Sequence, residues 1–397
     1  MTRAKPPYSQ RTQNIRISAA KLMPMLASGI GDCVSLGQGV PSFATPPHVV
    51  EAVCRALRDA PSAGKYSLQP GMAELRWAVA EQLAREKDLT ANPETELAIT
   101  VGGVEALFCA VLSLCERGDE VVIPEPCYPA YQEQVLLAEG RPVLVPLRRE
   151  DWSLDPEAVA AALTPRTKAI IINSPHNPTG AVFSREALLA VAALALRHDL
   201  YVICDDTYAT LSYDAPDWSL ASVPELHDRL VIVGSFSPRY ALTGWRVGYA
   251  FAAEPIMAQM LKIHDCAVSC APTPAQIAAL ASLTGPQEAY ADFKRLLAKR
   301  REHILGRLSA MGPILLPHGR PAGAFYVLVP YDLPLPPTDV ATRLIREAHV
   351  ITIPGDSFGP GGAQSLRLSY GGETAEIETA CDRLEDWLAQ AQKEPRP

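Results

Sequence analysis

Short apolar segments alternate with amphipathic segments through the middle of the chain. The apolar segments are rich in β-branched residues, which is typical of strands buried on both faces of a sheet. Helical patterns such as Val104–Cys115 and Arg185–Arg197 lie between several of them. This alternation predicts an α/β fold with a mostly parallel seven-stranded sheet covered by helices on both sides. The predicted strands are Leu97–Val101, Glu120–Ile123, Pro142–Pro146, Ala169–Asn173, Tyr201–Cys204, Leu230–Val233 and Val247–Phe251.

The pattern changes after residue 285, and the first 45 residues show little sheet pattern. We therefore predict a large domain over residues 46–285. A smaller α/β domain is predicted from residues 286–397 together with an N-terminal arm, residues 1–45. The elements predicted in the C-terminal third are a long amphipathic helix, two strands and a closing helix: Gln287–Met311, Ala324–Val329, Ser365–Ser369 and Thr374–Gln392.

Composition narrows the class of protein. A length of 397 residues suggests two or three domains. The net charge of 36 − 44 = −8 argues against nucleic-acid binding, since no basic excess would neutralise phosphates. No apolar segment is long enough to span a membrane, and Met1–Lys21 lacks the apolar core of a signal peptide. The nine cysteines are scattered without a Cys-x-x-Cys pair, so we expect a cytoplasmic protein without a metal site.

Two features of the chain suggest ligand binding before any family is considered. The turn Val101-Gly102-Gly103-Val104-Glu105 follows a predicted strand and opens a helix, an arrangement that suits an anion at the helix N-terminus. Asp205 ends another strand, where α/β sheets bind ligands in the crevice at their carboxyl edge. Each feature alone also fits a structural role, because such turns often bind nothing and an aspartate at a strand end is often a cap.

Four longer segments together are more specific. Residues 234–246 read Gly-Ser-Phe-Ser-Pro-Arg-Tyr-Ala-Leu-Thr-Gly-Trp-Arg. The others are Ser-Pro-His-Asn-Pro-Thr-Gly at 174–180, Cys-Asp-Asp-Thr-Tyr at 204–208 and Ser-Leu-Arg-Leu-Ser-Tyr at 365–370. In the order and spacing of these segments along the chain, the protein resembles the class I/II aminotransferases, pyridoxal-phosphate enzymes of fold type I. The resemblance covers nearly the whole chain.

The resemblance implies a cofactor site. Gly103, Val104, Ser235, Ser237 and Arg246 would contact the phosphate of pyridoxal or pyridoxamine 5′-phosphate. In the family a tyrosine matching Tyr66 reaches the same phosphate from the partner subunit, so a homodimer is expected.

The resemblance also assigns the cofactor ring and the substrate. Asp205 would pair with the ring nitrogen, Tyr208 and Asn177 would contact the phenolic oxygen, and Tyr128 would stack on the ring. The substrate would be an amino acid or keto acid. Arg367 would bind its α-carboxylate in a bidentate pair, and Gly39 belongs to the loop that closes over it.

One position departs from the family. The pattern Ser-x-Ser-Lys-x-x-x-x-x-Gly-x-Arg contains the lysine that forms the Schiff base with the cofactor, and here that position is Pro238. Proline has no titratable side chain and no backbone N–H, so it cannot take over any role of the lysine. Arg239 is a poor substitute because it holds its proton. Lys65 is the one other lysine in a segment expected near the cofactor.

Three interpretations follow from this departure. The protein is an enzyme that holds its cofactor non-covalently, or the fold has been reused for other lysine-independent chemistry, or the protein is a catalytically silent binding partner. The intact set of cofactor contacts favours the first interpretation.

Overall fold

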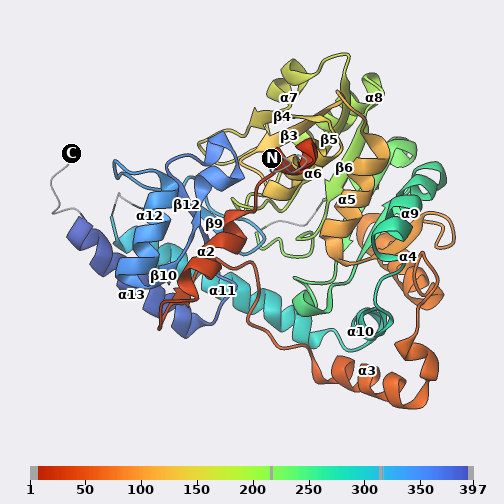
Figure 1. Ribbon diagram of the computed structural model, residues 1–397, viewed down its shortest axis with the longest axis horizontal. Helices are drawn as coiled ribbons and strands as arrows, with labels where there is room; N and C mark the ends of the chain where they lie inside the picture. The colour runs from red at the N-terminus through yellow and green to blue at the C-terminus, as the bar shows by residue number, and fades with distance from the viewer. Residues whose placement is uncertain (1–7, 215–217, 313–314, 316, 392–397) are drawn as a thin grey trace, which may run out of the picture.

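A seven-stranded sheet lies at the centre of the computed structural model, which describes residues 8–214, 218–312, 315 and 317–391 (Figure 1). The strand order is β2-β8-β7-β6-β5-β3-β4, and every neighbouring pair is parallel except those that β8 makes. All seven predicted strands are therefore confirmed. Their bounds are β2 Leu97–Thr100, β3 Glu120–Glu125, β4 Arg141–Pro146, β5 Thr167–Asn173, β6 Tyr201–Asp205, β7 Leu230–Ser235 and β8 Gly248–Ala252.

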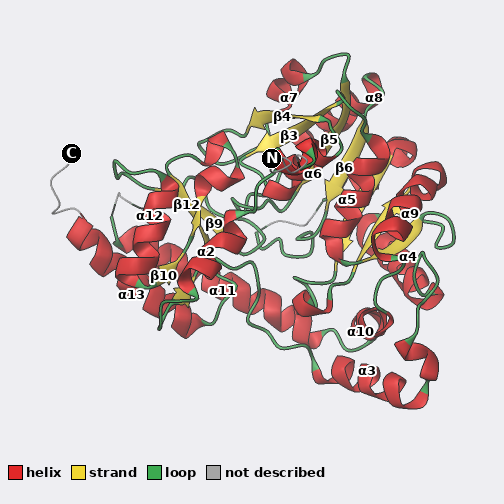
Figure 2. Ribbon diagram, in the orientation of Figure 1, coloured by secondary structure: helices red, strands yellow, loops and turns green. Residues whose placement is uncertain are grey.

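Helices cover both faces of this sheet (Figure 2). Alternate strand residues face opposite layers: Val121 and Ile123 join one buried cluster, while Val122 joins the other. Because both faces are buried, the strands are apolar at nearly every position, which made them easy to predict. One layer contains α5 Gly102–Leu114, α6 Pro129–Leu137 and α9 Glu254–Val268; the other contains α4 Ala73–Lys87, α8 Arg185–Arg197 and α10 Thr273–Thr284.

A second hydrophobic core combines the N-terminal arm with the C-terminal third. Helix α2 (Ala19–Ala27) lies among the C-terminal elements, as the red and blue ribbons of Figure 1 show. An antiparallel sheet orders its strands β11-β12-β9, and β1 pairs with β10 in parallel. The bounds are β1 Val34–Ser35, β9 Tyr326–Pro330, β10 Val350–Ile351, β11 Ile353–Pro354, β12 Ser365–Ser369, α11 Glu288–Ala310, α12 Pro337–Arg343 and α13 Thr374–Ala391.

The predicted C-terminal elements are confirmed with small shifts. The strand predicted from Ala324 begins at Tyr326, because Ala324 has a φ of 53°, in the left-handed region, and cannot continue an extended strand. Gln392, the predicted end of the last helix, lies outside the described residues. The remaining α-helices are α1 Gln10–Gln13, α3 Pro47–Asp59 and α7 Pro156–Ala162. The domain boundaries at residues 45/46 and 285/286 stay a prediction.

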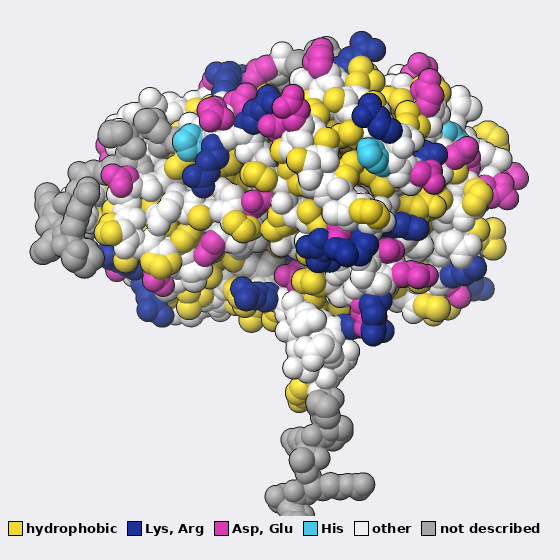
Figure 3. Space-filling model, turned by 90° about the horizontal axis from the view of Figure 1, so that it is seen from above, with side chains coloured by type: hydrophobic (Ala, Val, Ile, Leu, Met, Phe, Trp, Pro, Cys, Tyr) yellow, Lys and Arg dark blue, Asp and Glu magenta, His cyan; other side chains and the backbone are white. Residues whose placement is uncertain are grey.

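The surface is mixed in character. On the face in Figure 3, basic, acidic and apolar side chains are interspersed, without a single block of one charge. Within the described part of the chain, no helix has the length and apolar character that crossing a membrane requires.

Candidate functional site

A cavity of about 590 Å³ opens where the carboxyl ends of the central strands face the second core. Strand register brings Asn173, Asp205 and Val233 side by side, so the residues after β5, β6 and β7 reach one edge of the sheet. Most of the predicted site residues line the cavity: Gly39, Gly103, Val104, Tyr128, Asn177, Asp205, Tyr208, Ser235, Ser237, Pro238, Arg246 and Arg367.

The turn before α5 fits an anion. Gly102 has a φ of 73°, and a Cβ atom there would lie 2.7 Å from Nη2 of Arg246. Only glycine therefore lets the guanidinium approach the helix N-terminus. The Ser237 N–H donates to Oγ of Ser235 at 3.2 Å, while the buried Oγ of Ser237 has no hydrogen-bond partner among the described residues. An unpaired buried hydroxyl beside a helix N-terminus and an arginine suits a phosphate group.

Asp205 is held in place by two donors. Its Oδ2 accepts a hydrogen bond from the Tyr131 hydroxyl at 2.7 Å, and its Oδ1 accepts one from the Thr207 N–H at 3.0 Å. Burial raises the pKa of Asp205, and these hydrogen bonds oppose the rise. A buried carboxylate of fixed orientation is what a protonated pyridine nitrogen requires as a partner.

Arg367 is buried and partly paired. Its Nη1 donates to Oδ1 of Asn177 at 3.1 Å and its Nη2 donates to the Gly37 carbonyl at 2.7 Å. Its Nε has no hydrogen-bond partner in the described part of the molecule, and burial lowers the pKa of Arg367. Because Asn177 accepts through its oxygen, its amide nitrogen remains available as a donor. The arrangement therefore fits a carboxylate ligand at Arg367.

Two tyrosines that the sequence did not reveal, Tyr326 and Tyr131, also contact residues of the site. The Tyr326 hydroxyl lies 2.9 Å from the Tyr208 hydroxyl, and its ring lies 4.4 Å from Cζ of Arg367. A Cβ atom on Gly39 would come within 2.2 Å of the Tyr326 hydroxyl, so the loop needs glycine at that point. Tyr131, which orients Asp205, lies three residues after Tyr128, and that helical spacing could have indicated it.

Pro238 is buried and lines the cavity, whereas its neighbour Arg239 is engaged elsewhere. The Arg239 guanidinium donates to both carboxylate oxygens of Glu86 at 2.9 and 2.8 Å, so it is not a substitute for the missing amine. The lysine that lines the cavity is Lys21 of α2, the only one among the described residues to do so, and no motif in the sequence indicated it.

Tyr66 does not line the cavity of its own chain. Its side chain is 88% exposed, and its neighbour Leu68 is 71% exposed. Lys65 is likewise exposed and does not line this cavity. The segment that carries these residues is thus directed to the surface of the chain.

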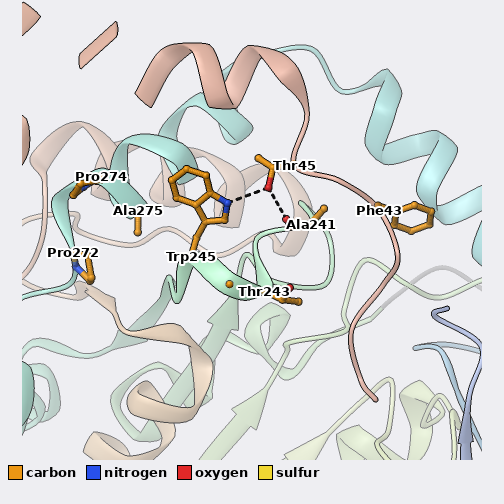
Figure 4. Close-up of a pocket in the computed structure, with 9 residues that line it drawn as sticks. Phe43, Thr45, Ala241, Thr243, Trp245, Pro272, Pro274 and Ala275 are labelled. Carbon is orange, nitrogen blue, oxygen red and sulfur yellow. Dashed lines mark hydrogen bonds between the residues drawn. The ribbon is translucent and has the colours of Figure 1, made fainter. Parts of the chain in front are cut away.

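A second cavity, of about 580 Å³, adjoins the first through Thr243, which lines both (Figure 4). Trp245 donates from Nε1 to Oγ1 of Thr45 at 3.0 Å, and Thr45 donates to the Ala241 carbonyl at 3.1 Å. These bonds fix the loop that ends at Arg246 against the N-terminal arm.

The known proteins that this chain resembles are aminotransferases, in agreement with the geometry of the cavity. A family model described as aminotransferase class I and II matches residues 31–384. An aspartate/prephenate aminotransferase of Thermus thermophilus is 38% identical over 394 residues, 96% of this chain and 99% of that protein. A putative aminotransferase of Bacillus subtilis is 36% identical over 382 residues, 96% of this chain and 98% of that protein.

Solved structures of aminotransferases have the same fold as this chain. The aspartate aminotransferase of Thermus thermophilus with maleate superposes with a TM-score of 0.90 at 36% identity, covering 96% of this chain and 100% of that one. An aromatic aminotransferase from Pyrococcus horikoshii gives 0.87 at 34% identity, covering 93% and 99%. The predicted fold type I architecture is therefore confirmed.

Proposed function

Because this chain belongs to the class I and II aminotransferase family, we propose that it acts on an amino acid or keto acid with a cofactor that is held non-covalently. The cofactor is pyridoxal or pyridoxamine 5′-phosphate. The observation that carries the proposal is the cavity itself, in which Ser237 and Arg367 retain unpaired buried groups while Asp205 presents an oriented carboxylate.

Each of the chain's own groups has a role in this proposal. The turn at Gly103, with Ser237 and Arg246, binds the phosphate. Asp205 holds a proton on the ring nitrogen, and Arg367 orients the α-carboxylate of the substrate through a bidentate pair. The cofactor, when bound, supplies an electron sink that stabilises negative charge on the α-carbon of the substrate.

Further contacts complete the site. The Tyr208 hydroxyl and the amide nitrogen of Asn177 donate to the phenolic oxygen of the cofactor, and Tyr128 stacks on its ring. Val104 and Ser235 line the cavity and would lie beside the phosphate, and Gly39 lets its loop approach Tyr326 closely.

The absence of a covalent link follows from Pro238. In this proposal Pro238 stands where the family has its lysine, and a proline offers neither an amine nor a proton-transfer group. The general acid–base part of the lysine's work is worth about 10²–10⁴-fold in rate, so turnover is slow. The relatives are named for different substrates, so their names do not identify the substrate of this chain.

The proposed active form is a homodimer in which Tyr66 reaches the phosphate site of the partner. Its high exposure, and that of Leu68, supports this role because neighbouring exposed large apolar side chains are typical of a protein interface. All nine cysteines are free, which supports a reducing compartment such as the cytoplasm.

Absorbance spectra test the function directly. Purified protein titrated with pyridoxal phosphate is expected to bind one cofactor per chain, with a spectrum unlike that of an imine to lysine. A protein that binds no cofactor would instead support the repurposed fold or the silent partner. Addition of a panel of amino acids then shows which of them shift the bound cofactor toward its amine form.

Borohydride reduction tests the non-covalent link. We expect peptide mapping of the reduced holoprotein to give no stoichiometric pyridoxyl-lysine, because the cavity has no lysine at position 238. Lys21 and Lys65 are the two residues to inspect, one for its place in the cavity and one for its place beside Tyr66. The matched positive control is Pro238→Lys, in which the adduct should map to residue 238. A stoichiometric adduct on Lys21 or Lys65 in the wild-type protein contradicts the proposal.

A further inference from the structure

A buried cluster of three polar side chains lies beside the phosphate-binding turn. His264 on α9 and Glu105 on α5 are joined by a contact of 2.9 Å between Nδ1 and Oε1. The Cys109 thiol donates to the same oxygen at 2.8 Å. His264 is 2% exposed, and the side chain of Glu105 is 10% exposed. The roles assigned to the cavity residues do not use this cluster.

His264 faces a hydrogen-bond acceptor at each ring nitrogen. Its Nε2 lies 3.1 Å from the carbonyl oxygen of Gln69, which can only accept, so Nε2 carries a proton. Its Nδ1 faces Glu105. Burial alone would raise the pKa of Glu105, but hydrogen bonds from His264, Cys109 and the Val101 N–H hold it below its usual value. The carboxylate is therefore ionised and accepts hydrogen bonds from the groups around it.

A metal ion would be the other explanation for a histidine, a cysteine and a glutamate so close together. In a tetrahedral zinc site, bond lengths of about 2.0–2.3 Å place the ligand atoms roughly 3.3–3.6 Å apart. The contacts that Glu105 makes here, 2.8 and 2.9 Å, are shorter, and the one to His264 matches an N–H···O hydrogen bond. Burial and the neighbouring Glu105 also raise the pKa of the Cys109 thiol, which keeps its proton. The cluster is thus a hydrogen-bonded group centred on the Glu105 carboxylate.

The other oxygen of Glu105 connects the cluster to the phosphate site. Oε2 accepts a hydrogen bond from the Val101 N–H at 3.0 Å, and Val101 directly precedes Gly102 and Gly103. Glu105 therefore fixes the backbone at the start of α5, where the N–H groups that face a phosphate begin.

The second partner of His264 reaches another segment of the site. Gln69 accepts from His264 through its carbonyl and donates from Nε2 to the Leu261 carbonyl at 2.7 Å, so it is held to α9 twice. Gln69 lies three residues after Tyr66, on the exposed segment proposed to enter the partner subunit. One imidazole thus joins the two segments that contact a phosphate in the proposed dimer.

We propose that His264 is a positioning residue for the cofactor phosphate, acting through Glu105 on the turn at Gly102 and through Gln69 on the segment of Tyr66. This inference rests on the proposed function, since it concerns the phosphate of the same cofactor. Removal of the imidazole leaves the buried Glu105 carboxylate without one of its hydrogen-bond partners, and such a group takes up a proton or turns toward solvent. In either case the hydrogen bond to Val101 is weakened, and the turn loses its fixed geometry.

The test compares ligands with and without a phosphate. Full-length wild type, His264→Leu and His264→Gln are titrated with pyridoxal phosphate, pyridoxal and inorganic phosphate by equilibrium dialysis. In His264→Leu, affinity for the two phosphate ligands is expected to fall by about tenfold or more, the effect of one lost charge-assisted hydrogen bond. Affinity for pyridoxal should stay close to wild type. His264→Gln retains N–H donors and should recover part of the loss.

A substitution outside the cluster serves as the matched control. Cys115→Ala removes a buried side chain at the end of α5 outside the cluster, and it should leave all three affinities unchanged. Equal losses for pyridoxal and pyridoxal phosphate in His264→Leu would show a general structural role. Stoichiometric metal in the purified wild type would show that the cluster is a metal site and would overturn the proposal. If wild type binds no phosphate ligand, the proposed function fails as well; if wild type and His264→Leu bind equally, only the role of His264 fails.

Discussion

Replacing Pro238 by lysine is expected to raise the single-turnover rate at which an amino acid converts the aldehyde cofactor to its amine form. Proton transfer at the α-carbon gains a base, and general acid–base assistance alone is worth about 10²–10⁴-fold. The remaining groups are already in place: Asp205 is oriented by Tyr131, and Arg367 is buried beside Asn177. The measurement is rapid-mixing absorbance of the holoprotein with a panel of amino acids.

The control for this gain is Pro238→Met, which gives a side chain of similar length without an amine and also releases the fixed φ of proline. It should remain as slow as wild type. A rise in Pro238→Met equal to that in Pro238→Lys would show that the backbone, and not the amine, limits the rate. Rapid turnover of wild type itself, with no adduct on Lys21, would mean that lysine matters less here than we infer.

The elements that position the site could be predicted because their patterns are local. A parallel strand buried on both faces is apolar at each position, and the polar residue that ends it, such as Asp205, is visible in the sequence. The family segments then placed Asn177, Arg246 and Arg367 in one cavity, where the structure brings them together.

The residues that were missed depend on contacts between distant parts of the chain. Tyr326 comes from the second core, 118 positions after the Tyr208 that it contacts. Lys21 reaches the cavity only because α2 packs against C-terminal strands. His264 and Glu105 are 159 positions apart. No pattern of spacing along the sequence specifies such pairs, since they are set by how the two cores pack.

For Arg239, the structure adds a contact that the sequence could not show. Its position next to Pro238 made it a candidate substitute for the lysine, and its fixed charge excluded it as a base. The structure supplies a direct reason, because Glu86 on α4 binds the guanidinium. Burial lowers the pKa of Arg239, but its hydrogen bond and attraction to Glu86 outweigh that effect and raise the pKa above its ordinary value.

Substitution of Asp205 by alanine is expected to weaken cofactor binding more than Tyr208→Phe does. The variant loses a charge-assisted partner of the ring nitrogen, worth about 1.5–3 kcal/mol, or roughly 10- to 150-fold in Kd. Tyr208→Phe removes a neutral hydrogen bond of about 0.5–1.5 kcal/mol. Because burial raises the pKa of Asp205, its carboxylate is lost at a higher pH than that of an exposed aspartate, and wild-type affinity should fall as the pH is lowered through that range.

Asp206 provides the matched control, since it is the next residue with the same charge. Its carboxylate pairs with Lys87 at 2.7 Å and accepts from Ser219 at 2.9 Å, and it does not line the cavity. Asp206→Asn should therefore keep its cofactor affinity while losing thermal stability, because it breaks a buried ion pair, a change that costs about 3–5 kcal/mol. Spectroscopic titration and thermal unfolding of the three variants separate the two effects. Equal cofactor affinities for Asp205→Ala and wild type would mean that the carboxylate does not meet a ring nitrogen and that the cavity serves another ligand.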